Sequence, residues 1–340
     1  MTSQPARSRT SLTGISSRAW EHPADRGALV ALRKLKGFDS VLKAVSGLVS
    51  ERRVRLEYLG SGVRVDDRQF AGIHRLVAEV GRVLDVAELP EVFVVNQPFT
   101  GAMTIGMDKP IVVLHSALLD LFTEEELRFV VAHEIGHALS GHAVYRTLLM
   151  RLLELSGVWG AVPGGALGVR VIIAALYEWQ RKSELSADRA GLLATQDPAV
   201  AFRVHMKLAS GSGDLSELDQ TSFFAQGQEY LDTSDVRDSV LKLMLVERTT
   251  HPYAAVRAAE LRRWVDSGDY TRVLGGDYPR REDDASASMT DAARAAAASY
   301  ADTFRQTQDA LGNLVHEVAG FLGSAKIWFD EQLRRTRGSD

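Results

Sequence analysis

The spacing of apolar residues predicts a mainly helical chain with one short group of strands. Across residues 66–86 the apolar positions recur at intervals of three and four, which is the period of an amphipathic helix. Residues 92–95, 103–105 and 111–114 form shorter apolar runs separated by turn-forming residues, a pattern typical of strands. We therefore expect an α+β fold, mainly helical, in which a small sheet leads into a long helix.

The long helix is predicted to begin after Thr123. Thr123 and Glu126 have the spacing of a capping box, in which each side chain satisfies a backbone N–H of the other residue. Apolar residues continue at helical spacing as far as Ala138. Two further helices are predicted, over residues 183–193 and 251–265.

Composition divides the chain into four regions. Residues 1–22 are rich in Ser, Thr and Arg, lack the apolar core of a secretory signal and are expected to be disordered. Residues 23–90 are expected to form an N-terminal helical region, and residues 91–281 the principal domain. Residues 282–340 are expected to form a linker and a C-terminal amphipathic helix, which packs on its own domain or binds a partner or a membrane surface.

Residues 155–177 raise the question of a membrane span. The segment is apolar and long enough to cross a bilayer, but it contains Arg170, Pro163 and five glycines. A charge within a span is costly in lipid, and Pro and Gly interrupt helices. Two short buried helices joined by a Pro-Gly-Gly turn are therefore preferred. The chain is expected to be cytoplasmic, with peripheral contact at a membrane left open.

Composition and charge narrow the candidate chemistry. The 340 residues include 40 Lys and Arg against 44 Asp and Glu, so the chain lacks the basic surplus expected of a nucleic-acid-binding protein. The absence of cysteine excludes disulfides, thiolate metal sites and thiol nucleophiles. Any metal ion must therefore be held by carboxylates and by some of the nine histidines.

One motif on the predicted long helix suits this requirement. His133 and His137 are four residues apart in an HExxH sequence, so both imidazoles lie on one helix face and can reach a single ion. Glu134 lies beside that face and can act as a general base towards a metal-bound water. The alternative of two structural histidines is disfavoured, because capping and periodicity predict the helix independently of the motif.

The third metal ligand is expected to be a carboxylate. Ala143 occupies the position at which another class of zinc peptidase has a third histidine. His142 lies well round the helix from the ligand face and is expected to be a surface histidine or a support for a ligand. Glu184 is the preferred third ligand, and Asp188, one helical turn later, is expected to orient a ligand histidine.

The order of these motifs resembles the gluzincin family of the CAAX prenyl protease and HtpX heat-shock protease type. The resemblance rests on Asn96 with Phe99-Thr100-Gly101, Glu124 to Leu127, His133 to His137, Glu184 to Gly191, and His251-Pro252 with Arg257. It implies a zincin-like metallopeptidase core within residues 91–281 and a single zinc ion bound by His133, His137 and Glu184. It also implies that Glu134 is the base and that protein or peptide substrates are cleaved.

The resemblance further implies that His251 and Arg257 face the active site. Either could stabilise the oxyanion of the tetrahedral intermediate, and His251 could instead bind zinc in a resting state. The alternative for His251 is a capping residue at a helix that starts with Pro252. Residues 111–114 are expected to form the sheet edge to which an extended peptide adds.

Two alternative functions remain open. The first is a chaperone-like or regulatory protein in which a closed zinc site stabilises the fold. The second is a membrane-associated protease of the same family, anchored by residues 155–177 or by the tail helix.

Overall fold

The computed structural model describes residues 8–34, 38, 42, 51–159, 165–232, 253–286 and 294. Its helices are α1 (Pro23–Lys34), α3 (Glu51–Ser61), α4 (Ala71–Val83), α5 (Ser116–Leu121), α6 (Glu124–Leu139), α7 (His142–Trp159), α8 (Gly165–Thr195), α9 (Pro198–Ser210), α10 (Gln220–Asp232), α12 (Ala254–Asp266) and α13 (Asp269–Leu274), with short 3-10 helices at Ser17–Ala19 and Arg281–Ser286. Its strands are β1 (Gly62–Arg64), β2 (Glu91–Val95), β3 (Ala102–Ile105) and β4 (Ile111–His115). The mainly helical α+β fold is confirmed.

The described strands form one sheet in the order β1-β2-β4-β3. β4 pairs in parallel with β2 and antiparallel with β3, so it lies inside the sheet and not at its edge. The expectation that residues 111–114 form the edge is therefore wrong. All five residues of β4 are buried, as a central strand requires, whereas the first half of β3 is only half-buried. The edge strand on the side of α6 is β3.

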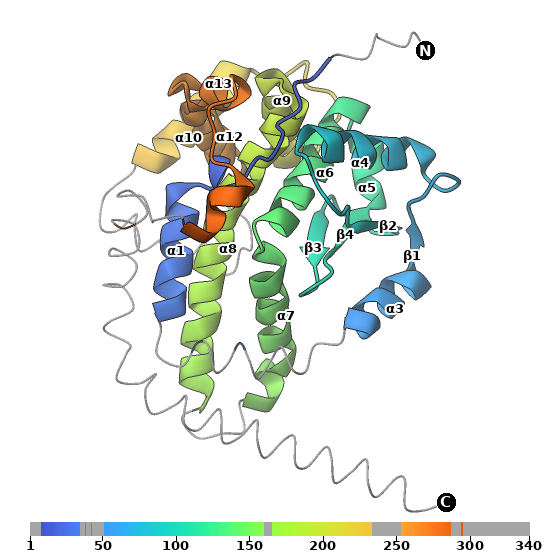
Figure 1. Ribbon diagram of the computed structural model, residues 1–340, viewed down its shortest axis with the longest axis vertical. Helices are drawn as coiled ribbons and strands as arrows, with labels where there is room; N and C mark the ends of the chain where they lie inside the picture. Colours follow the sequence, from blue (N-terminus) through green and yellow to red (C-terminus); the bar gives the residue numbers. More distant parts are fainter. Residues whose placement is uncertain are drawn as a thin grey trace, which may run out of the picture.

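Helix α6 lies at the centre of the molecule, between the sheet and α8 (Figure 1). The predicted capping box is present, and the backbone N–H of Thr123 donates to Glu126 Oε2 at 2.8 Å. From Arg128 to His137 every residue is buried, so α6 is covered on all sides. Beyond α6, the helices α1, α7 and α8 pack side by side around a second apolar cluster.

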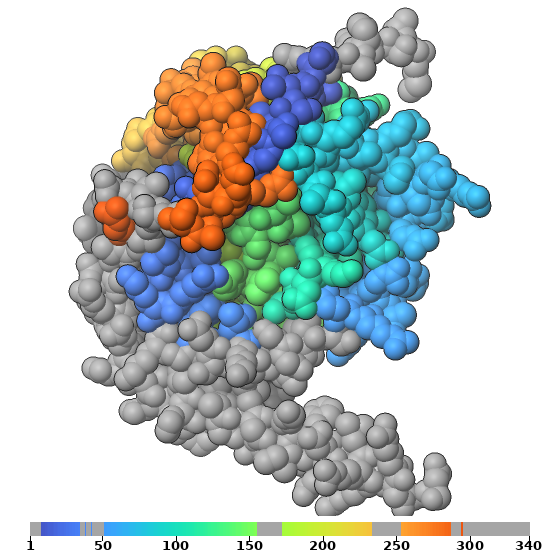
Figure 2. Space-filling model, in the orientation of Figure 1, coloured from blue at the N-terminus to red at the C-terminus, as the bar shows by residue number. Residues whose placement is uncertain are grey.

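Residues 8–22 do not form the disordered segment expected from their composition. Leu12, Ile15 and Trp20 are almost completely buried, and Trp20 Nε1 donates to Ser140 Oγ at 3.1 Å. Figure 2 shows this segment lying between the residues around α13 and those around α4. Only three large apolar residues anchor it, too few to form a periodic pattern, and their burial depends on tertiary contacts.

Several other boundaries also differ from the predictions. The division at residue 90 does not hold, because β1 pairs with β2 and α4 packs against α6. Helix α4 begins at Ala71 and not near residue 66, since Asp66 Oδ1 accepts hydrogen bonds from the backbone of Arg68 and Gln69 in a turn.

The described parts of the apolar segment 155–177 are the end of α7 and the beginning of α8. They belong to two long helices and not to the two short ones that were expected. Helix α7 ends at Trp159 with 18 residues, α8 has 31 residues, and the connecting residues 160–164 lie outside the described part. In the described part of the chain, no helix combines the length and the apolar character needed to cross a membrane. The predicted tail helix and His251 lie outside the described residues.

Candidate metal centre

Small residues bring α6 and α8 close enough to share a site. A Cβ atom on Gly136 would lie 2.6 Å from the Cβ of Ala190, and one on Gly191 would lie 2.9 Å from the ring of Phe129. Any larger residue at either glycine would push the helices apart, because both contacts are already closer than real Cβ atoms come. This close packing places the HExxH residues against Glu184.

The three predicted metal ligands converge in the structure. His133 Nε2 lies 3.1 Å from His137 Nε2 and 3.3 Å from Glu184 Oε2, and His137 Nε2 lies 3.4 Å from Glu184 Oε1. All three side chains are buried, and their donor atoms fall within 4.8 Å of one another. Two imidazole nitrogens and one carboxylate oxygen form a donor set typical of catalytic zinc centres, although other divalent ions use the same donors.

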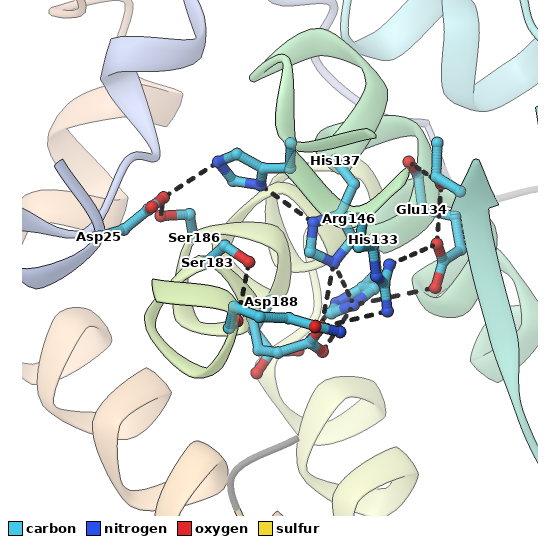
Figure 3. A network of polar contacts seen from close by, with 12 residues as sticks. Asp25, His133, Glu134, His137, Arg146, Ser183, Ser186 and Asp188 are labelled. Atoms are coloured by element: carbon cyan, nitrogen blue, oxygen red, sulfur yellow. Dashed lines mark hydrogen bonds and ion pairs between the residues drawn. The ribbon is translucent and has the colours of Figure 1, made fainter. Parts of the chain in front are cut away.

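The buried network around these donors (Figure 3) carries an excess of negative formal charge. Its carboxylates and guanidinium groups belong to Asp25, Glu134, Glu184 and Asp188, and to Arg146 and Arg257. With both imidazoles neutral, as metal binding requires, two negative charges are left over, and uncompensated charge is costly inside a protein. A divalent cation would balance this excess, so the residues fit a metal ion.

Asp188 contacts the first of the two predicted ligand histidines. Its Oδ1 lies 3.0 Å from His133 Nδ1, so that Nε2 of the same ring faces the other donors. Burial raises the pKa of Asp188, but the charge of Arg257 and the hydrogen bonds to Arg257 and His133 outweigh burial and hold that pKa well below its usual range. The role expected of Asp188 thus agrees with its geometry.

Arg257 binds the carboxylates behind the donors. Its Nε donates to Asp188 Oδ2 at 2.8 Å and its Nη2 to Asp188 Oδ1 at 2.5 Å, while Nη1 lies 3.4 Å from Glu184 Oε2. The side chain is buried. Two hydrogen bonds to one carboxylate fix the guanidinium in place, an arrangement that suits a positioning role better than the expected binding of an oxyanion.

His142 contacts the second predicted ligand histidine. Its Nδ1 lies 2.9 Å from His137 Nδ1, and its side chain is buried, so the expectation of a surface position is wrong and that of a ligand support agrees with the structure. His205 is also buried, 3.6 Å from Asp188 Oδ2, and burial lowers its pKa to about 4.

Glu134 lies beside the donors and is held from two sides. Thr104 Oγ1, on the edge strand β3, lies 2.8 Å from both the carbonyl oxygen and Oε2 of Glu134. Arg146 Nη1 lies 3.5 Å from the same Oε2, and Arg146 Nη2 lies 3.4 Å from Glu184 Oε1. Neither Thr104 nor Arg146 belongs to a motif, so sequence reasoning missed both. Only the fold brings them to the site.

Without a metal ion, the two predicted ligand histidines differ in their pKa values. Burial lowers the pKa of His133, but its hydrogen bonds to Asp188 and Glu184 outweigh burial and raise that pKa to about 9. Burial and the charge of Arg146 lower the pKa of His137 well below its usual value. At pH 7 His133 therefore carries a proton that must leave before a metal ion binds both imidazoles.

Metal affinity is expected to rise with pH between about pH 6 and pH 8. Throughout this range His133 is protonated in the metal-free centre, so each unit of pH raises the apparent metal affinity by about tenfold. Competition with a chelator of known proton affinity, repeated across the range, measures the effect. An apparent affinity that stays constant with pH would contradict it.

The donors open onto a cleft of about 760 Å³. His133, Glu134 and Glu184 form one wall, and the residues just before β3 form part of the rim. The remaining lining is largely apolar, with Leu118, Phe129, Val130, Val204, Leu208 and Phe223. A cleft of this size can admit a polypeptide side chain to the predicted metal donors.

Comparison with known proteins identifies the family. The model of peptidase family M48 matches residues 67–265, more than half of the chain. The plastoglobule-localized metallopeptidase 48 of Arabidopsis thaliana chloroplasts is 32% identical over 259 residues, which cover 75% of this chain and 74% of that protein. The mitochondrial metalloendopeptidase OMA1 of the same plant is 33% identical over 132 residues, which cover 36% of this chain and 27% of that protein.

A bacterial relative supports the same assignment. A protease HtpX homolog of Caldanaerobacter subterraneus is 28% identical over 123 residues, which cover 33% of this chain and 40% of that protein. No solved structure shows a significant match. The family model covers more than half of the chain, and the chloroplast metallopeptidase aligns with three quarters of it. This protein therefore belongs to peptidase family M48 and is a metallopeptidase.

Proposed function

We propose that this chain is a zinc-dependent endopeptidase that hydrolyses peptide bonds in protein substrates. The observation that carries the proposal is the convergence of His133, His137 and Glu184 beside Glu134 at the wall of the cleft. A zinc ion held by these three residues would acidify the attacking water and polarise the scissile carbonyl. The names of the relatives, which include metallopeptidases and proteases, support the same reaction class.

Glu134 supplies the proton transfers in this mechanism. Its carboxylate lies beside the ligand histidines, with Oε1 4.0 Å from His133 Nε2, and Thr104 holds its other oxygen. Glu134 takes a proton from the attacking water and returns it to the leaving amide nitrogen, so its own charge is unchanged over the cycle. Thr104 fixes the carboxylate in the orientation that both transfers need.

The edge strand β3 is the proposed docking site for the substrate backbone. An extended peptide can add to an open sheet edge through main-chain hydrogen bonds, and β3 holds Thr104 next to Glu134. A substrate side chain then enters the apolar part of the cleft beside Phe129 and Val130. We expect peptides with Leu or Phe at this position to have a kcat/KM at least about tenfold above those with Asp. Equal values across a matched peptide series would contradict this.

Arg257 is proposed to act through Asp188 and not on the substrate. The variant Arg257→Lys keeps the charge but loses the paired hydrogen bonds to Asp188, so zinc affinity is expected to fall about tenfold. Chelator competition measures the affinity, and steady-state kinetics on the zinc-saturated variant measure kcat. A large loss of kcat with unchanged zinc affinity would instead support the oxyanion role expected from the sequence.

The closed-site alternative requires a fourth ligand from the protein. Three donors converge among the described residues, so a fourth ligand of a tetrahedral ion would be either water or a further residue. His251, the candidate for a fourth ligand, lies outside the described residues, and so does the tail helix on which the membrane-bound alternative depends. The location of the protein and a partner for its tail therefore stay predictions.

The proposal is tested by metal analysis combined with a proteolysis assay. Purified protein is analysed for its metal content, and casein cleavage is measured before chelation, after chelation and after zinc is added back. The proposal requires one zinc ion per chain and cleavage that the chelator abolishes and zinc restores. Zinc-loaded protein without cleavage would favour the closed site, and cleavage by metal-free protein would contradict the mechanism.

A further inference from the structure

A line of buried polar contacts runs from the ligand His137 to the N-terminal helix α1 (Figure 3). His137 Nδ1 lies 2.9 Å from His142 Nδ1, and His142 Nε2 lies 3.1 Å from Asp25 Oδ2. Ser186 Oγ donates to the same oxygen of Asp25 at 2.6 Å. Asp25, His142 and Ser186 are each at most 2% exposed, so water does not compete for these hydrogen bonds.

The order of protons along this line follows from the orientation of His137. Its Nε2 faces the other metal donors, so Nδ1 must carry the hydrogen and donate it to His142 Nδ1. His142 then carries its own hydrogen on Nε2 and donates it to Asp25 Oδ2. Each ring therefore has one defined tautomer, and the carboxylate of Asp25 sets both.

Each of the two predicted ligand histidines is thus linked to a buried carboxylate, one directly and the other through a second imidazole. His133 donates directly to Asp188, which Arg257 holds, whereas His137 reaches a carboxylate through one intervening imidazole. A carboxylate behind a metal-bound histidine fixes the ring and makes its ligand nitrogen more basic. Asp25 would have this effect on His137 through His142.

Asp25 lies outside the part of the chain that matches the family model. That match covers residues 67–265, while Asp25 belongs to α1, which begins at Pro23. Helix α1 packs against α8, and the backbone N–H of His22 donates to Ser186 Oγ at 2.8 Å just before α1 begins. The aromatic edge contact of His142 with Trp179, with ring centres 5.4 Å apart, holds the imidazole from α8.

We propose that Asp25 and His142 are positioning residues for the metal ligand His137, so that α1 completes the metal centre from outside the family domain. This inference rests on the proposed function, because it takes His137 to be a metal ligand. Ser186 seats Asp25 from α8, the helix that also carries Glu184. The ligand helix, the Glu184 helix and α1 therefore meet in a single hydrogen-bonded unit.

The test measures zinc affinity in the full chain by competition with a chromophoric chelator. Asp25→Asn keeps the shape of the side chain but removes its charge, and it is expected to weaken zinc binding about tenfold. His142→Phe keeps a ring but removes the nitrogen that accepts from His137, and it is expected to weaken zinc binding up to about 100-fold. If the two residues act in series, the double variant binds zinc as weakly as His142→Phe alone. A loss of affinity in the double variant equal to the product of the two single losses would show that the residues act independently and would contradict the proposal.

Cobalt substitution distinguishes an effect on the metal ligand His137 from a general effect on folding. The visible absorption bands of bound Co²⁺ report the ligand field, and both single variants are expected to shift them while the circular dichroism of the metal-free protein stays unchanged. Should His142→Phe fail to fold, Asp25→Asn, which is nearly isosteric, still tests the proposal. Wild-type affinity and an unshifted cobalt spectrum in Asp25→Asn would overturn it.

Matched controls separate this inference from the proposed function. Asp266→Asn and His74→Gln change the same residue types at exposed positions and are expected to bind zinc as the wild type does. If the wild type binds no zinc, the proposed function fails and the inference with it. If the wild type binds zinc and cleaves casein while both variants match it, only the inference fails.

Discussion

Replacing Glu134 by Gln is expected to lower kcat/KM for peptide cleavage by about 10³-fold, while the protein keeps its zinc ion. Gln has nearly the same shape as Glu and can still contact Thr104, but its amide accepts no proton from the attacking water. Because Glu134 is not one of the three donors, its replacement is expected to weaken zinc binding far less than the replacement of a donor would. Steady-state kinetics and the zinc content of the same sample measure the two properties.

The control for this variant is Glu124→Gln in the first turn of the same helix. The Glu124 side chain is 79% exposed and distant from the donors, so its replacement is expected to leave cleavage and zinc content unchanged. Full activity of Glu134→Gln at wild-type zinc content would show that another group is the base. Loss of zinc together with activity would show instead that Glu134 is a ligand.

Replacing Glu184 by Gln is expected to weaken zinc binding by more than about 100-fold and to abolish cleavage at ordinary zinc concentrations. The amide removes the only anionic donor of the three, and it leaves the guanidinium groups of Arg146 and Arg257 without the carboxylate that both approach.

Thermal unfolding with and without added zinc measures this loss. Zinc at about 100 times its dissociation constant stabilises the wild type by about 2.7 kcal/mol and so raises its Tm, whereas the same concentration stabilises the variant by less than about 0.4 kcal/mol. Glu178→Gln is the matched control on α8, since Glu178 pairs with Arg181 and Lys182 away from the donors. An equal rise of Tm in Glu184→Gln would rule out Glu184 as a ligand.

The metal-binding helix could be predicted because its determinants are local. The start at Thr123 follows from a capping box four residues long, and the shared face of His133 and His137 follows from the helical period. The same period relates Glu184 to Asp188. That Glu184 meets the HExxH residues was inferred from the order of the motifs, and the contact of Gly136 with Ala190 shows how the two helices come close enough.

The edge of the sheet could not be predicted in the same way. The apolar runs of β3 and β4 each predict a strand, but the order of strands depends on which run pairs with β2. The fully buried β4 takes the centre, and the half-buried β3 is left at the edge beside Glu134. Likewise, the burial of Leu12, Ile15 and Trp20 depends on surfaces far along the chain.

The sequence by itself determined the HExxH helix, the likeness to a known family and the residue types of the metal donors, because helical spacing is set within a few residues. Only the tertiary structure decided what surrounds the donors. Asp188 meets Arg257 across 69 residues and Asp25 meets Ser186 across 161, and no local pattern records such a pairing. These contacts form because a buried charge is stable only when the packing of the chain places a hydrogen-bonding or charged partner beside it.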